Sequence, residues 1–139
     1  TLVCQGQGVI GGTRSDLEAL GELTPTLAAL CALAVSPSKL TGIGHLRGHE
    51  TDRLHALETE INRLGGKAHA GENSLTISPT PLHGDLVKTY ADHRMAMFAA
   101  LIGLQVSGVQ IADIECVSKT FPDFTATWEA MLAGANGLA

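Results

Sequence analysis

The stretch Asp92-His-Arg-Met-Ala-Met-Phe-Ala-Ala100 aligns without a gap to Glu22-Leu-Thr-Pro-Thr-Leu-Ala-Ala-Leu30 when the chain is shifted by 70 residues. In each copy an acidic residue precedes an apolar run that is typical of a helix. The same shift places His49 on Lys119, and a second helix follows in both copies. This agreement predicts tandem copies of one small α/β unit. We expect residues 1–21 to end a preceding unit, 22–91 to form one unit, and 92–139 to form most of another.

Local signals predict an α/β (α+β) chain of short strands and amphipathic helices. The clearest helix has Leu54, Leu57, Ile61 and Leu64 on one face. The clearest hairpin surrounds Gly71-Glu72-Asn73. Residues 79–90 are expected to form a loop. We expect strands at 1–5, 40–46, 67–70, 74–78 and 109–114, and helices at 22–35, 50–64, 92–106 and 122–132.

Composition narrows the class of protein. The chain has 139 residues, 45% of them hydrophobic and only 4% aromatic, so its core must consist mainly of aliphatic side chains. The formal charge of −5 argues against a general nucleic-acid surface, although clustered cations can still bind anions. No apolar run is long enough to span a membrane. Three cysteines without paired spacing and the lack of a signal peptide favour a cytoplasmic protein without a disulfide framework.

Two stretches match known binding motifs only in part, one for a dinucleotide and one for zinc. Gly6-Gln-Gly-Val-Ile-Gly11 matches a dinucleotide fingerprint, but the long helix that such a site needs does not follow, so we interpret the stretch as a glycine turn. His49-Glu50 begins like a zinc motif, but Arg53 replaces the second histidine, and its cation would repel a metal. No metal is therefore expected. Three further histidines are expected on the surface: His55, His69 and His83.

Three polar clusters precede predicted helices, at residues 48–53, 91–94 and 118–123. Each could be only a helix start, with Asp92 as an N-cap. Arg94, however, is unfavourable in a first helical turn, because the positive end of the helix dipole lies there. Helix N-termini with arginine and lysine beside them are typical of sites for phosphate and carboxylate groups.

These clusters carry a resemblance to a known family. The strings His49-Glu-Thr-Asp-Arg-Leu54, Asp92-His-Arg-Met-Ala-Met97 and Lys119-Thr-Phe-Pro-Asp123, with Glu22-Leu-Thr-Pro-Thr26 upstream, resemble the bacterial form of the 5-enolpyruvylshikimate-3-phosphate (EPSP) synthase family. The likeness extends over nearly the whole chain and corresponds to the C-terminal part of such an enzyme. It implies tandem βαβαββ units of the enolpyruvyl transferase-like fold, with mixed small sheets packed on helices.

The resemblance also implies a reaction. Members of this family transfer the enolpyruvyl group of phosphoenolpyruvate to the 5-hydroxyl of shikimate-3-phosphate in the shikimate pathway, which leads to chorismate and the aromatic amino acids. They use no metal and no organic cofactor. By motif position, Glu22 would contact the attacking hydroxyl and Glu50 would handle the methylene proton. Arg53, Arg94 and Lys119 would bind phosphoenolpyruvate, and the inhibitor glyphosate would use the same three cations.

The remaining implied roles are less regular. Asp92 and His93 would support the site. Glu22, His45 and His49 would contact shikimate-3-phosphate, although the family commonly has Asp, Asn and Lys at these positions. Other substrate contacts belong to an N-terminal domain of the same enzyme, so we expect this chain to be inactive without it.

Two alternatives stay open. UDP-N-acetylglucosamine enolpyruvyl transferase shares the fold and the chemical class, but it uses a loop cysteine. No cysteine of this chain lies in a candidate catalytic loop, and Asp92-His-Arg-Met has the EPSP synthase form. The chain could also act as an isolated, non-catalytic domain. Turnover by the purified chain distinguishes an enzyme from such a module.

Overall fold

A four-stranded mixed sheet covers one side of the molecule. A computed structural model of the chain describes residues 1–3, 5–6 and 8–136. The strand order is β1-β2-β4-β3, in which β1 and β2 are parallel and the other neighbours are antiparallel. The structure confirms the predicted hairpin, with strands at residues 67–70 and 74–78. It forms where predicted because alternating buried residues and a tight turn specify it locally. The strands are β1 (Arg14–Asp16), β2 (Ser38–Thr41), β3 (Lys67–Ala70) and β4 (Ser74–Ser78).

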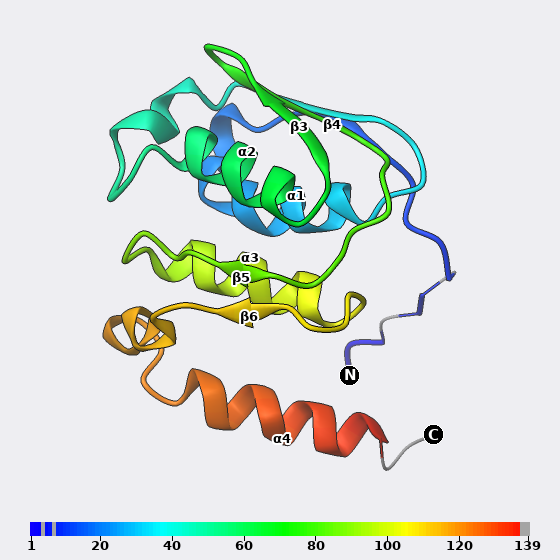
Figure 1. The fold of residues 1–139 in the computed structure, drawn as a ribbon, viewed down its shortest axis with the longest axis vertical. Helices are drawn as coiled ribbons and strands as arrows, with labels where there is room; N and C mark the ends of the chain where they lie inside the picture. The colour runs from blue at the N-terminus through cyan, green and yellow to red at the C-terminus, as the bar shows by residue number, and fades with distance from the viewer. Residues whose placement is uncertain (4, 7, 137–139) are drawn as a thin grey trace.

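Two helices pack beneath this sheet. Helix α2 (Arg53–Arg63) buries the apolar face that its spacing predicted, with Leu57 and Ile61 fully inaccessible to solvent. Helix α1 (Thr24–Ala32) is lined with small residues such as Ala28 and Ala29, which allow α3 to pack closely against it. Figure 1 shows α1 and α2 between the four-stranded sheet and the second half of the chain.

The second half repeats the order strand, helix, strand, helix. It consists of β5 (Leu86–Val87), α3 (His93–Gly103), β6 (Gln110–Ile111) and α4 (Phe124–Asn136), with β5 and β6 paired in parallel. The same order occurs as β1, α1, β2 and α2 in the first half. The predicted α/β class with small mixed sheets packed on helices is thus confirmed. The division at residues 21 and 91 stays a prediction.

Three short 3₁₀ helices shorten the predicted elements. The strand expected over 40–46 ends at Thr41, because Gly42 adopts φ +73° and η2 (Gly44–Gly48) follows. The strand expected over 109–114 ends at Ile111, since Asp113 is left-handed and starts η3 (Ile114–Lys119). Glu22 lies in η1 (Glu18–Leu23), so α1 begins two residues later than expected.

Other boundaries also differ from the sequence prediction. The loop expected over 79–90 contains β5. The strand expected over 1–5 is wrong for its described residues, because Leu2 and Val3 are exposed and pair with no strand; Cys4 lies outside the described residues. Within the glycine motif, Gln7 also lies outside them, and a strand rather than a long helix follows.

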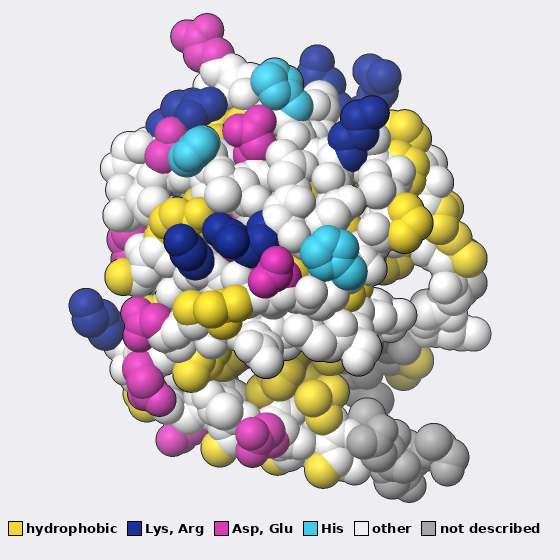
Figure 2. Space-filling model, in the orientation of Figure 1, with side chains coloured by type: hydrophobic (Ala, Val, Ile, Leu, Met, Phe, Trp, Pro, Cys, Tyr) yellow, Lys and Arg dark blue, Asp and Glu magenta, His cyan; other side chains and the backbone are white. Residues whose placement is uncertain are grey.

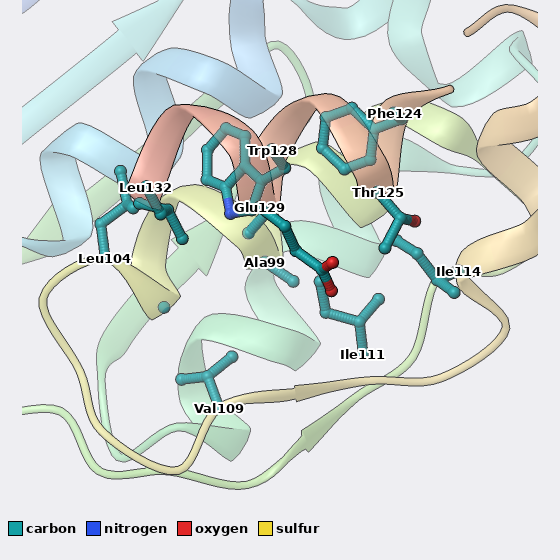
Figure 3. A pocket seen from close by; sticks show the side chains of 12 residues that line it. Ala99, Leu104, Val109, Ile111, Ile114, Phe124, Thr125, Trp128, Glu129 and Leu132 are labelled. Atoms are coloured by element: carbon teal, nitrogen blue, oxygen red, sulfur yellow. The ribbon is translucent and has the colours of Figure 1, made fainter. Parts of the chain in front are cut away.

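Helix α4 packs more loosely than the others. It borders a hollow of about 260 Å³ that separates it from α3 and β6, and Figure 3 shows Phe124, Trp128 and Leu132 around this space. Met131 is 50% exposed. Hydrophobic and acidic side chains show on the surface over α4 in Figure 2, whereas most of the lysines and arginines on that face lie higher. None of the helices in the described part of the chain has the length and apolar character needed to cross a membrane.

Candidate anion-binding site

Arg53 is the centre of a buried polar network at the start of α2. Its side chain is only 2% exposed. Its guanidinium donates to both oxygens of Asp92, from Nε at 2.6 Å and from Nη2 at 3.3 Å. Nη1 lies 3.1 Å from Glu22 Oε2 and 3.3 Å from His49 Nδ1. Such a forked contact fixes the plane of the guanidinium as well as its position. Burial alone would lower the pKa of Arg53, but Asp92 and then Glu22 raise it, so the group stays charged.

Asp92 joins the starts of two helices. It is fully buried, and as the N-cap of α3 its Oδ1 accepts a hydrogen bond from the backbone N–H of Arg94 at 2.9 Å. The cap hypothesis for Asp92 is therefore confirmed, but the same carboxylate also pairs with Arg53 on α2. One residue thus fixes two helix N-termini beside each other, and both present a partial positive charge.

The backbone just before Asp92 is unusual. Tyr90 and Ala91 have φ values of +56° and +55°, although neither is glycine. Left-handed conformations of this kind cost about 1–3 kcal/mol each and persist only where the surroundings determine them. The Asp92 N–H donates to Thr89 O at 2.9 Å and closes the bend. Strain of this sort is concentrated at functional sites, which makes this bend a feature to explain.

Glu22 extends the network toward solvent. Its side chain is 53% exposed, and its carboxylate lies near Arg53, His49 and Arg94, with His49 Nδ1 at 3.2 Å and Arg94 Nε at 3.8 Å. Partial burial raises the pKa of Glu22, but the hydrogen bond and charge of Arg53, followed by the charges of His49 and Arg94, outweigh burial and lower it. Glu22 is consequently ionised at neutral pH and suited to accept a hydrogen bond from a hydroxyl.

Arg94 has an unused donor. Its Nε is buried from solvent yet has no hydrogen-bond partner among the residues that the structure describes. An unpaired buried N–H costs about 1–3 kcal/mol, more for a charged group. The charge of Arg94, the two helix N-termini and the neighbouring Arg53 together make this position attractive to a carboxylate or a phosphate.

A second group of predicted residues lies next to the first. His93 Nδ1 is 3.7 Å from Glu50 Oε2 and 3.9 Å from Asp92 Oδ1. Glu50 and His93 line a hollow of about 340 Å³ with Lys119 and Tyr90. The structure therefore places Glu50 and Lys119 in one hollow and Glu22, Arg53 and Arg94 in one network. Asp92 and its neighbour His93 connect the two groups.

His45 and His49, which stand where the resembling family commonly has Asn and Lys, lie in different surroundings. His49 pairs with Glu22 and Arg53 inside the network. His45 packs against Gly21, where a β-carbon would collide with the imidazole, and it borders a separate polar hollow with Asp16 and Asn73. The two imidazole centroids are 6.0 Å apart. Only His49 joins the arginine network directly.

A metal ion fits this site poorly. Ligand atoms of Glu50, Asp92 and His93 lie within 4.8 Å of one another, which is close enough for a cation. The Asp92 oxygens, however, already accept hydrogen bonds from Arg53 and from the N–H of Arg94. A divalent cation would meet the guanidinium charge of Arg53 at once, and this repulsion favours an anion instead.

Sequence reasoning missed Tyr90 and Glu60. Tyr90 lines the hollow with Glu50 and Lys119, and its hydroxyl donates to Glu60 Oε1 at 2.7 Å. Tyr90 is the only tyrosine in the chain, and it lies two residues before Asp92. This position beside a predicted site residue could have identified it from the sequence. Glu60 offered none, because it reads as an ordinary helical acid.

Comparisons with known proteins identify the family of this chain. The family model for EPSP synthase (3-phosphoshikimate 1-carboxyvinyltransferase) matches residues 2–128. The chain is 54% identical over 132 residues to a 3-phosphoshikimate 1-carboxyvinyltransferase from Kocuria rhizophila, covering 95% of this chain and 29% of that protein. It is 52% identical over 138 residues to the protein of that name from Mycobacterium ulcerans, covering 98% and 32%.

Solved structures give the same result. Two structures of EPSP synthase from Acinetobacter baumannii match with TM-scores of 0.69. They are 28% and 26% identical and cover 74% and 77% of this chain, but only 25% and 26% of those chains. This chain belongs to the EPSP synthase family, and it spans about three-tenths of the length of the curated relatives that it matches.

Proposed function

We propose that this chain forms one wall of an enolpyruvyl-transfer site, in which phosphoenolpyruvate reacts with the 5-hydroxyl of shikimate-3-phosphate. The observation that carries the proposal is the buried Nε of Arg94, which has no hydrogen-bond partner among the described residues and lies beside the buried Arg53–Asp92 pair. Arg53, Arg94 and Lys119 would bind the carboxylate and the phosphate of phosphoenolpyruvate, and glyphosate would compete there. A guanidinium that is already fixed in place needs no reorganisation when charge develops on the substrate, and preorganised electrostatic stabilisation of this kind is usually the largest single contribution to catalysis.

The proton transfers follow from the two carboxylates. Glu50, paired with His93, would deliver a proton to the methylene carbon while the hydroxyl oxygen attacks the adjacent carbon. Glu22 would accept the hydrogen bond of that hydroxyl and help to remove its proton. Because the pKa of Glu22 is lowered, Glu22 is a weak base here, and its role would be mainly to orient the hydroxyl. The C–O bond to the phosphate would then break, and one proton of the new methyl group would return to Glu50, so that the enolpyruvyl double bond re-forms and phosphate leaves.

The other wall would come from the remaining part of the enzyme. The relatives are about three times as long as this chain. Contacts with the shikimate phosphate would come from residues outside the 139 of this chain. Near-attack geometry requires both substrates to be held with water excluded, and a misplacement of ~1 Å can cost ~100-fold in rate. We therefore expect no turnover by this chain alone. His45, His49 and Glu22 would contact shikimate-3-phosphate at the boundary, and a cytoplasmic location belongs to the same proposal.

A chimeric enzyme tests this function. The 139 residues would replace the matching segment of the Kocuria rhizophila relative, and phosphate release would be followed with both substrates. The chimera should turn over, and Arg94→Ala should reduce kcat/KM by at least ~100-fold. His83→Ala, a change at an exposed residue that belongs to neither group of the proposed site, is the control and should have no effect. A folded chimera without turnover, or one insensitive to Arg94→Ala, would contradict the proposal.

A further inference from the structure

Glu60 is a buried carboxylate that lies outside the proposed catalytic groups. It follows Arg53 by seven residues on α2, so both side chains lie on the same face of that helix. Glu60 is fully inaccessible to solvent. Its carboxylate accepts hydrogen bonds from the Tyr90 hydroxyl at 2.7 Å, from Lys88 N at 3.0 Å and from Arg63 Nε at 2.9 Å. Two of these three donors belong to the segment that connects β5 to α3.

Helix α2 therefore holds this connecting segment at two places. Glu60 binds Lys88 and Tyr90, whereas Arg53 binds Asp92. The left-handed residues Tyr90 and Ala91 lie between these two attachments. Ala91 is exposed, so packing of its own side chain does not offset its backbone strain. The contacts at either end must fix the bend.

The Tyr90 hydroxyl is suited to this role. Burial, followed by the hydrogen bond to Glu60 and the charge of Glu60, raises the pKa of Tyr90 to about 12. The phenol therefore remains a hydrogen-bond donor at neutral pH. Glu60 needs such donors, because a buried carboxylate without them would carry a large desolvation cost.

We propose that Glu60 and Tyr90 are positioning residues, whose hydrogen bond holds the Tyr90–Ala91 bend and thereby places Asp92 against Arg53. The inference rests on the proposed function in one respect only, since the arginine it positions is the one proposed to bind phosphoenolpyruvate. A merely structural contact would stabilise the attachment of the segment between β5 and α3 to α2 without affecting the guanidinium of Arg53.

The test compares wild-type chain with Tyr90→Phe by ¹⁵N NMR of the Arg53 Nε–H, without any ligand. Loss of the hydroxyl should shift this resonance and make its hydrogen exchange about five- to tenfold faster. Backbone amides of the β3–β4 hairpin should not change. Glu58→Gln is the matched control, because Glu58 lies on the same helix but accepts its hydrogen bond from Ala70 N of β3. It should leave the Arg53 signal unaltered.

A rescue experiment separates positioning from stability. Glycine adopts the left-handed conformation freely, so adding Ala91→Gly to Tyr90→Phe should return part of the lost protection at Arg53. Should Tyr90→Phe alone fail to fold, the double variant compared with Ala91→Gly alone gives the same measurement. A folded Tyr90→Phe chain with an unchanged Arg53 resonance and exchange rate would overturn the inference. Because no ligand is used, failure of wild-type chain to bind phosphoenolpyruvate would count against the proposed function and not against this positioning.

Discussion

The two halves of the chain have the same order of strands and helices, but their last helices, α2 and α4, are packed very differently. Side chains such as Leu57 and Ile61 on α2 are fully buried, and Arg53 at its start makes four polar contacts. Helix α4 leaves Met131 half exposed and borders an apolar hollow (Figure 3). A repeated pattern thus predicts which elements occur and in which order, but it does not predict how tightly each copy is packed.

The difference has a physical consequence for the proposed site. Its arginines are attached to the tightly packed copy and to α3, where rigid elements keep the donors in place. Lys119 lies at the end of η3, five residues before α4 begins. We expect the α2–α3 junction to determine both the stability of the fold and the geometry of the site, and α4 to contribute little to either.

Asp92→Ala should have the largest effect on stability. It leaves the guanidinium of Arg53 buried without its main partner and removes the cap of α3, so the free energy of unfolding should fall by about 3–5 kcal/mol. Urea denaturation followed by circular dichroism measures this loss. Asp52→Ala is the matched control, because Asp52 caps α2 and pairs with an arginine, Arg47, in an exposed setting. It should cost only about 0.5–2 kcal/mol, and equal losses would show that burial of the pair is unimportant.

Leucine truncation compares the two copies directly. Leu57→Ala on α2 should lower the free energy of unfolding by about 2–5 kcal/mol, because it leaves a cavity in a closed core. Leu132→Ala on α4 should cost less than about 1 kcal/mol, since that side chain is already partly exposed beside a hollow. Similar losses in the same denaturation assay would mean that α4 is as firmly packed as α2.

Sequence reasoning succeeded where the determining signals are local. The β3–β4 hairpin and the apolar face of α2 were predicted because alternation and helical spacing need no distant partner. The strand expected over 40–46 failed because Gly42 takes up a left-handed conformation, and the strand pattern does not report that choice. Glu22 was expected to open a helix, but it lies in the preceding 3₁₀ turn.

The sequence predicted the residues of the candidate site but not the contacts between them. Helix starts with cations indicated an anion site, and the motifs identified the individual residues. The pairing of Arg53 with Asp92 joins residues 39 apart, and that of Glu60 with Tyr90 joins residues 30 apart, so only the fold reveals them. The bend at Tyr90 and Ala91 is adopted against the intrinsic preference of both residues, so local propensity points the wrong way there.

The smallest expected effect concerns pH. Because the folded state lowers the pKa of Glu22, its ion pairs stabilise the fold above the unfolded pKa near 4.5, and this contribution is lost as pH falls through the folded pKa. Half of the side chain is exposed, so the contribution should be below about 1 kcal/mol. Glu22→Gln should therefore reduce the change in unfolding free energy between pH 6 and pH 3 by a few tenths of a kcal/mol. An unchanged pH profile would show that Glu22 gains nothing from Arg53.

The most direct test is a titration of the chain with phosphoenolpyruvate at low salt, followed by ¹⁵N NMR of the arginine Nε–H groups. We expect binding with a Kd of ~1 mM, since only one wall of the site is present, and weaker binding as the salt concentration rises. The resonance of the Arg94 Nε–H should shift, because a ligand oxygen would supply the hydrogen-bond acceptor that this group does not find within the described part of the chain. Arg94→Ala should abolish binding, while Lys67→Ala, at an exposed position of β3, should not change it. Binding that survives Arg94→Ala, or that leaves the Arg53 and Arg94 resonances unmoved, would contradict the assignment of this network as the phosphoenolpyruvate site.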